Sequence, residues 1–194
     1  MSNTLSPKGF QELGLANGAV PNFGLSRGKM AYNASACYSG DAIVASSGKL
    51  AVATTTGASG AAVAGIAVSF SWVSTAQNRR VWQNFYPGND SQGNQDVDVN
   101  FINHPDALFV VQSNGTTAIA QADVGKFGNF ATTNTGSSAS GLSGMSLDYA
   151  NLNATKGTLP FYINRLVEAP ATDPASAYNL VIVGFASGNL TQIG

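Results

Sequence analysis

Large apolar residues alternate with small ones at several places in this 194-residue chain, and glycine- or asparagine-rich turns separate these places. The clearest case is residues 66–73 (IAVSFSWV), where isoleucine, valine, phenylalanine and tryptophan alternate with alanine and serine. A period of two is typical of a strand that buries one face. Residues 97–101 (VDVNF) repeat the pattern, and no amphipathic helix of useful length is evident. The sequence therefore predicts an all-β fold.

Turn residues divide the other strand signals at the spacing of a barrel or a sandwich. Ser46-Ser47-Gly48 predicts one hairpin turn, and residues 113–115 (SNG) predict another. We expect residues 123–125 to open a single helical turn, and the last strand, apolar on both faces, to be central or to lie at a subunit interface. About nine or ten short strands favour an antiparallel β-barrel or a jelly-roll-like β-sandwich. The further strands are expected at residues 43–44, 50–56, 80–86, 107–112, 116–120, 146–149, 159–168 and 178–186.

Residues 1–40 keep neither the period of a strand nor that of a helix for long, because glycines and two prolines interrupt the apolar residues. Glycine costs conformational entropy in regular elements, so we expect an extended, irregular N-terminal arm over residues 1–40 and a barrel or sandwich body over residues 41–194. The apolar residues of such an arm need a surface to cover, either on this domain or on a neighbouring subunit. They are Phe10, Leu13, Leu15, Val20, Phe23 and Leu25.

Charged residues are scarce, with nine basic and ten acidic side chains and a net charge of -1. An ordinary soluble domain carries about a quarter charged residues. Such a surface suits a protein packed against other protein, because each buried unpaired charge is costly. A neutral, turn-rich β protein with no such partner is the alternative, and composition favours neither.

The reactive side chains do not form a catalytic or metal-binding pattern. The single cysteine, Cys37, is expected to be a small buried residue, and the single histidine, His104, to be a turn residue before a proline. Asp96 and Asp98 alternate, with Asp106 not far beyond, and could offer oxygen ligands to calcium, but a solvated strand face is the favoured explanation. We predict no cofactor, no metal and no enzymatic activity.

Nucleic acid and membrane are not predicted partners. Arg79-Arg80 is the only adjacent basic pair, and no basic stripe accompanies it. No apolar run approaches the length of a membrane span, and residues 1–10 lack the apolar region of a secretory signal.

A series of short motifs, in one order along the chain, resembles the head decoration, or cement, proteins of tailed bacteriophages. Each motif is turn or strand chemistry, and the likeness spans roughly residues 40–190. This chain departs from the family at Val110, where glutamate is usual, at His104, where aspartate is frequent, and in lacking a Gly-Cys pair before the aromatic turn. The motifs are residues 85–88 (FYPG), 104–112 (HPDALFVVQ), 114–115 (NG), 122–126 (ADVGK), 135–136 (TG) and 141–148 (GLSGMSLD).

The resemblance implies a virion structural protein, made in the bacterial host cytoplasm, that binds the outer surface of a phage capsid. It would reinforce contacts between capsomers of the major capsid protein, as a homo-oligomer with a trimer favoured. The candidate capsid or subunit contacts are the six apolar residues of the arm named above.

Two further classes of function stay open at this stage. One is a glycan-binding β-sandwich module of a phage tail or fibre, with Trp72, Trp82 and Tyr86 as stacking platforms, although Trp72 is expected in the core. The other, least favoured, is a hydrolase that uses serine, aspartate and His104.

Overall fold

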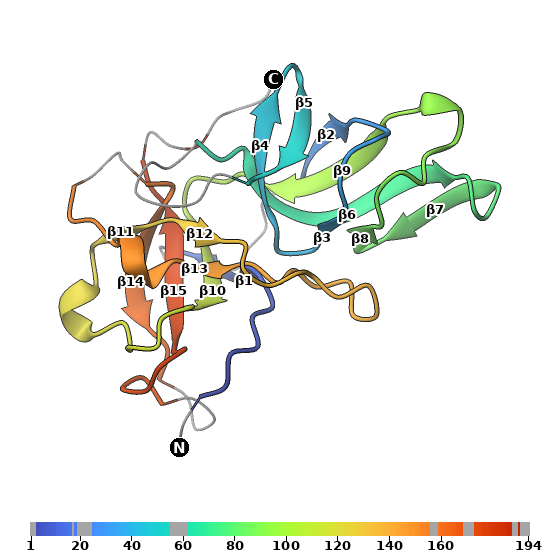
Figure 1. The fold of residues 1–194 in the computed structure, drawn as a ribbon. Helices are drawn as coiled ribbons and strands as arrows, with labels where there is room; N and C mark the ends of the chain where they lie inside the picture. The colour runs from blue at the N-terminus through green and yellow to red at the C-terminus, as the bar shows by residue number, and fades with distance from the viewer. Residues whose placement is uncertain are drawn as a thin grey trace.

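The computed structural model confirms the all-β fold class. The described residues form fifteen strands and three short 3-10 helices, arranged in two lobes (Figure 1). They are residues 3–16, 18, 25–54, 62–155, 159–168, 173–187 and 190.

The first lobe is a closed five-stranded barrel. Its strands pair in the order β4, β5, β2, β9, β6 and back to β4, all antiparallel except the contact between β2 and β5. A further strand, β7, extends the barrel sheet beside β6, and the short pair β3–β8 lies next to it. The bounds are β2 (Ser26–Met30), β3 (Cys37–Tyr38), β4 (Ala42–Ser46), β5 (Lys49–Val52), β6 (Gly65–Ser74), β7 (Arg79–Gln83), β8 (Phe85–Tyr86) and β9 (Val97–Ile102).

The barrel interior holds one of two hydrophobic cores. The alternating apolar residues of β9 point inward, as the sequence predicts, while Asp98 and Asn100 face outward. Gly28 of β2 also faces inward, because a Cβ there would lie 2.5 Å from Leu50 Cδ1. The core consists of Met30, Cys37, Ile43, Leu50, Ala64, Ala67, Phe70, Trp72, Val81, Tyr86, Val97, Val99 and Phe101.

A β-bulge in β6 reassigns the faces of the strand that the sequence marks most clearly. The register with β9 shifts between Ala67 and Ser69, and a bulge of this kind reverses the alternation beyond it. Ala67, Phe70 and Trp72 therefore face the barrel interior, whereas Ile66 joins the core of the second lobe. Ala67 is 1% exposed, although a regular alternation that buries the large residues of this strand would place the alanine on the opposite, open face.

The second lobe, which we call the sheet lobe, is a five-stranded sheet in the order β1, β10, β15, β14, β11, with the pair β12–β13 beside it. Its core is rich in phenylalanine, including Phe10, Phe109, Phe161 and Phe185. β15 is central, as predicted for the last strand. The bounds are β1 (Gln11–Leu15), β10 (Ala107–Gln112), β11 (Phe127–Gly128), β12 (Phe130–Ala131), β13 (Ser146–Leu147), β14 (Phe161–Leu166) and β15 (Leu180–Phe185).

A long connector, residues 132–145, ties the two lobes together. It leaves β12, reaches toward β3 and β8 and returns to β13 (Figure 1). The Ser39 N–H group donates a 3.0 Å hydrogen bond to the Gly141 carbonyl, and the Ser143 N–H group donates a 2.9 Å bond to the Ser39 carbonyl. The ring of Tyr38 lies where a side chain at Gly136 would be.

The hairpin turn at Ser46-Ser47-Gly48 is confirmed. It joins β4 to β5, with Ser47 at φ 51° and Gly48 at φ 76°, and two residues at positive φ match the twist that a tight hairpin needs. The predicted strand over residues 80–86 is divided between β7 and β8.

The hairpin predicted at residues 113–115 is wrong. β10 pairs with β1 and β15 instead, and residues 116–120 form no strand. The side chain of Asn179 holds this segment by accepting from the Ile119 N–H group and donating to the Ile119 carbonyl, at 3.1 and 2.9 Å. The single helical turn expected to begin at residue 123 lies slightly earlier, as the 3-10 helix η2 (Gln121–Asp123). The other two 3-10 helices are η1 (Gln92–Asn94) and η3 (Tyr149–Asn151).

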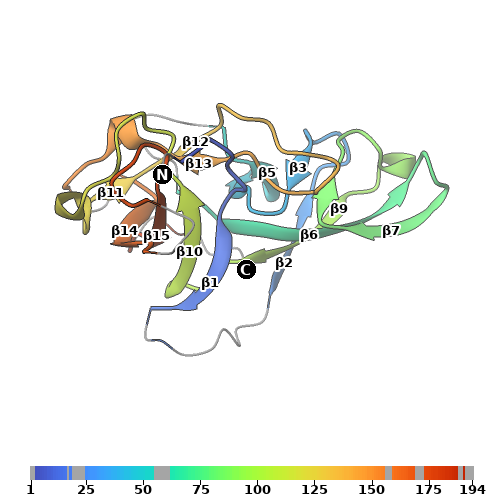
Figure 2. The same cartoon turned by 90° about the horizontal axis from the view of Figure 1, so that it is seen from below.

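The described part of residues 1–40 is not an irregular arm. β1 lies beside β10 at the edge of the sheet lobe (Figure 2), with a bulge before Gly14, and β2 is a barrel strand. Interstrand hydrogen bonds and tertiary packing outweigh the low strand propensity of glycine here. The expected boundary at residue 40 therefore does not separate an arm from a body.

Candidate functional site

The single cysteine is placed where its thiol is a poor nucleophile. Cys37 is buried, and burial together with the nearby Asp41 carboxylate raises the pKa of the thiol well above its usual range. A thiol that stays protonated reacts slowly. The single histidine, His104, accepts a 3.2 Å hydrogen bond at Nδ1 from the Asp106 N–H group and so shapes the turn into β10.

A buried carboxyl group anchors the connector to the barrel lobe. Asp41 is only 4% exposed. Its Oδ1 accepts a 2.5 Å hydrogen bond from the Ser143 hydroxyl, and its Oδ2 accepts a 2.7 Å bond from the Tyr38 N–H group. Burial raises the pKa of Asp41, and these hydrogen bonds oppose that effect only in part. We assign this group a structural role, because its partners leave it no access to a substrate.

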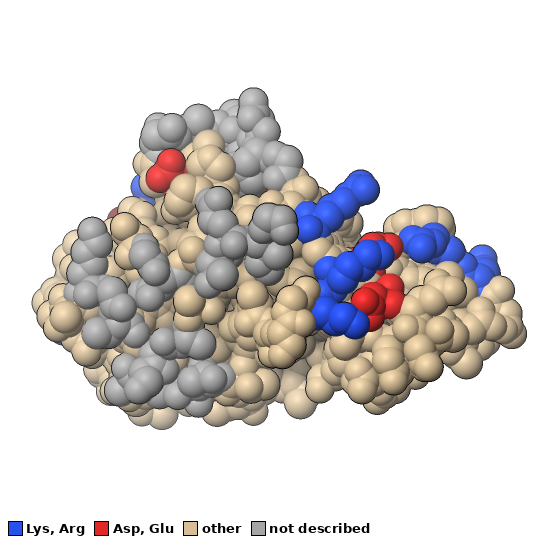
Figure 3. All heavy atoms as spheres, turned by 90° about the horizontal axis from the view of Figure 1, so that it is seen from above, with Lys and Arg blue, Asp and Glu red and all other residues tan. Residues whose placement is uncertain are grey.

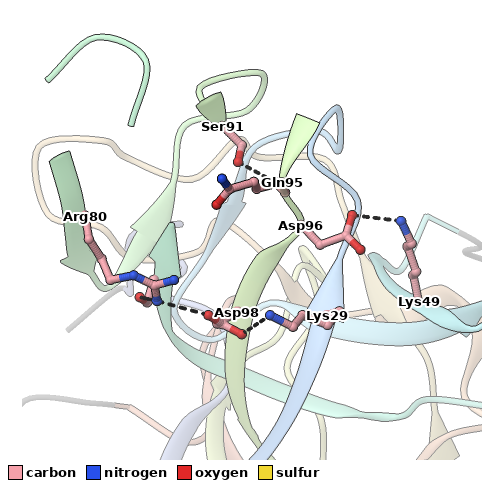
Figure 4. A network of polar contacts seen from close by, with 8 residues as sticks. Lys29, Lys49, Arg80, Ser91, Gln95, Asp96 and Asp98 are labelled. Carbon is pink, nitrogen blue, oxygen red and sulfur yellow. Dashed lines mark hydrogen bonds and ion pairs between the residues drawn. The ribbon is translucent and has the colours of Figure 1, made fainter. Parts of the chain in front are cut away.

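The outward side of β2, β9, β6 and β7, which we call the barrel face, carries a network of charged side chains (Figure 4). Asp98 is at its centre, with Lys29 Nζ 2.6 Å from Oδ1 and Arg80 Nη1 3.2 Å from Oδ2. The same Arg80 nitrogen donates a 2.9 Å hydrogen bond to Ser71 Oγ. Burial alone would raise the pKa of Asp98, but the bonds from Lys29 and Arg80 outweigh it and lower that pKa.

Asp96 is also paired, with Lys49 Nζ 2.7 Å from its Oδ1. Its neighbour Gln95 accepts a hydrogen bond from the Ser91 hydroxyl at the backbone carbonyl (Figure 4). Of the three carboxylates considered as calcium ligands, Asp96 and Asp98 are thus engaged by basic side chains. Within the described parts of the chain, no three histidine, cysteine, aspartate or glutamate side chains gather as a metal site would require.

Charged side chains cluster on one part of the face that Figure 3 shows. Seen from above, most of the visible lysine, arginine and aspartate side chains gather over the barrel lobe, while the rest of that view is almost free of them (Figure 3). The ion pairs of Asp96 and Asp98 belong to this group. The charged cluster of this face is therefore built in part from ion pairs.

Trp82 is the most exposed large hydrophobic side chain of the described residues, at 70%. The other two aromatic residues considered as stacking platforms are internal. Trp72 is 2% exposed and its Nε1 donates a 2.9 Å hydrogen bond to Asp90, and Tyr86 is 0% exposed and its hydroxyl donates a 2.6 Å bond to the Tyr32 carbonyl. The core position expected for Trp72 is confirmed, and a platform role for Tyr86 is wrong.

The six candidate contact residues of the N-terminal segment differ in exposure. Leu13 and Leu25 are each 44% exposed, and Leu15 is half-buried. Phe10 is 2% exposed and lies against Phe161 and Phe109 in the core, so its ring has no surface left for a capsid or a subunit. Val20 and Phe23 lie outside the described residues.

Comparisons with known proteins found no match. Neither a protein-family model, nor a curated protein, nor a solved structure is similar to this chain. In the described part of the chain, no helix has the length and apolar character needed to cross a membrane. We therefore argue function from the surfaces described above.

A hollow of about 620 Å³ opens between residues 31–35 and 46–54 at the barrel. Small alanine and serine side chains form much of its lining. Among its lining residues Lys49 alone is charged, and that lysine is paired with Asp96.

Proposed function

We propose that this protein binds the outer surface of a bacteriophage capsid and reinforces the contacts between capsomers of the major capsid protein. We further propose that it does so as a homo-oligomer, with a trimer favoured, on the outside of the virion. The ordered motifs that resemble phage decoration proteins suggest this function, and the distribution of exposed apolar side chains supports it.

The observation that carries the proposal is where the exposed apolar side chains lie. Of the five large hydrophobic residues exposed in the described part of the chain, four fall between residues 5 and 32. A contiguous exposed apolar patch is typical of an interaction surface, and the proposal requires these side chains to face one partner together. They are Leu5 at 37%, Leu13 and Leu25 at 44% each and Tyr32 at 36%.

The framework behind these side chains is well suited to a mechanical role. Leu13 lies on β1 and Leu25 directly precedes β2, and these strands belong to the two different lobes, so each of these leucines is tied to an ordered sheet. Covering what remains exposed of one such leucine stabilises a contact by roughly 1 kcal/mol. Many equivalent contacts on a repeating lattice convert such modest energies into lasting attachment.

Binding to shells provides the test. Purified protein is added to shells of the encoding phage that lack it, and occupancy is measured by co-sedimentation and imaging. We expect wild type to saturate the shells, and Leu13→Ser with Leu25→Ser to weaken the affinity per subunit by roughly tenfold to thirtyfold. Trp82→Ala, which removes a more exposed apolar group from the barrel face (70% against 44%), is the control and should bind as wild type does.

Two outcomes would contradict the proposal. A wild-type chain that never sediments with the shells rules out capsid attachment. A double leucine variant that saturates them at wild-type concentration, while Trp82→Ala does not, moves the contact to the barrel face. Circular dichroism of each variant confirms that the fold is retained.

A further inference from the structure

Trp82 is the one large exposed hydrophobic residue of the described chain that lies outside residues 5–32, and its surroundings suggest a second binding surface. Trp82 lies on β7, which pairs only with β6 among the described strands. Its partner across the sheet is Ser71, which pairs in turn with Asp98. At this position the large flat indole lies next to a small serine that is 5% exposed. The Arg80 guanidinium, which bonds Ser71 Oγ at 2.9 Å, is therefore a donor group beside the indole.

The groups beside the indole are hydrogen-bonding groups rather than apolar ones. In the next row of the sheet, Ser69 pairs with Asn100, whose Nδ2 donates a 3.0 Å bond to Ser69 Oγ. Asp98 is two strands away from Trp82, at roughly 10 Å from strand spacing alone. A carboxylate, an amide and a guanidinium thus lie along one side of the indole, within the length of two linked sugar rings.

The ion pairs of this face argue against a polyanion. Arg80 and Lys29, the basic residues nearest to Trp82 in the sheet, are both engaged by Asp98, and the Arg79 guanidinium donates to the Gln77 side chain. A nucleic-acid surface needs basic side chains free to pair with successive phosphates. The paired charges instead offer oriented donors and acceptors to a neutral ligand.

A protein partner is also disfavoured. Stable protein interfaces have a desolvated apolar centre, whereas Trp82 is the one large exposed hydrophobic among the described residues of β2, β6, β7 and β9. We infer that the barrel face binds a neutral oligosaccharide, with one pyranose ring stacked on Trp82 and its hydroxyl groups bonded to the Asn100, Asp98 and Arg80 side chains. This activity is separate from attachment to the capsid and does not depend on it.

The stacking geometry explains why the two kinds of group are needed together. A pyranose presents axial C–H groups on its faces and hydroxyl groups around its rim, so an indole can cover a face while planar polar side chains bond the rim. Aromatic faces contribute beyond simple area burial. A small number of placed polar groups then fixes the orientation of the ligand.

The test is titration of the purified protein with three neutral sugars, cellohexaose, maltohexaose and hexa-N-acetylchitohexaose, monitored by calorimetry and by tryptophan fluorescence. We expect at least one of them to bind with an affinity that sodium chloride leaves unchanged. Trp82→Ala should weaken that binding by at least about tenfold, and Trp82→Phe should weaken it less because a ring remains. Leu13→Ser, an exposed apolar residue outside the barrel face, is the matched control and should bind normally.

Several results would overturn this inference. One is that none of the three hexasaccharides binds to the protein, and another is that wild type and Trp82→Ala bind them equally. A third is that the protein binds only single-stranded DNA or an acidic polysaccharide, with strong salt dependence. Shell binding measured on the same Trp82→Ala sample separates the two proposals, because we expect that variant to lose the sugar and keep the shell.

Discussion

Replacement of Phe10 by alanine distinguishes an N-terminal segment that belongs to the core from one that merely lies on it. The Phe10 ring stacks on Phe161 with ring centres 4.4 Å apart and meets Phe109 edge-on at 6.5 Å. The residue is 2% exposed. Its backbone N–H group also donates a 3.0 Å hydrogen bond to the Gly40 carbonyl, so the surroundings cannot collapse freely onto the space that the ring leaves.

The expected cost follows from this packing. Truncation of a buried phenylalanine to alanine destabilises a protein by about 3–5 kcal/mol, and a site that relaxes poorly lies toward the upper end. Two aromatic pairs are lost as well. For a protein of this size we therefore expect the Phe10→Ala variant to melt roughly 6–20 °C below wild type.

Urea unfolding followed by circular dichroism, with a thermal scan of the same samples, measures the loss. Leu13→Ala is the matched control, because it removes a side chain three residues away that is 44% exposed. We expect the control to cost about 1–1.5 kcal/mol, because just over half of that side chain is buried, which is well below the cost of Phe10→Ala. A Phe10→Ala variant that unfolds at the same urea concentration as Leu13→Ala would refute the placement of this segment in the core.

Two further predictions concern buried ionisable groups. Burial raises the folded-state pKa of Asp41 above its unfolded value, so the neutral carboxyl group contributes stability at low pH that is lost as pH rises through the folded-state pKa. The unfolding free energy of wild type minus that of Asp41→Asn should therefore fall with rising pH. A flat or rising difference would contradict this. Cys37 is buried and the pKa of its thiol is raised, so a thiol-reactive disulfide reagent should modify it only as fast as the protein opens. Rapid stoichiometric reaction of the native protein would instead place the thiol at the surface.

Local patterns predicted the elements whose partners are close in sequence or whose alternation is regular. The serine-glycine turn between β4 and β5 needs only its own backbone conformation, so it was readable directly. The alternation of β9 and the two-sided apolar character of β15 also matched their positions, one half-exposed and one central. The sequence also placed Trp72 in the core, but it could not separate the exposed Trp82 from the buried Tyr86. The pairing of β7 with β6 and of β8 with β3 decides which way those two side chains face.

The elements that were missed depend on distant residues. Gly28 weakens the strand signal of β2, yet it is required because Leu50 fills the space that its missing side chain leaves. The turn residues 113–115 suggest a hairpin, but the Asn114 side chain accepts a hydrogen bond from the Tyr149 N–H group, and Asn179 captures the following segment. No local pattern records such partners.

The order in which strands enter the sheet lobe has a consequence for synthesis on the ribosome. All barrel strands lie between residues 26 and 102, so the barrel can close while translation continues. β10, however, must wait for β15, its neighbour at residues 180–185. At 5–20 residues per second this apolar strand keeps one edge unpaired for roughly 3–14 s, an interval in which newly made chains are most prone to aggregate and most in need of chaperones.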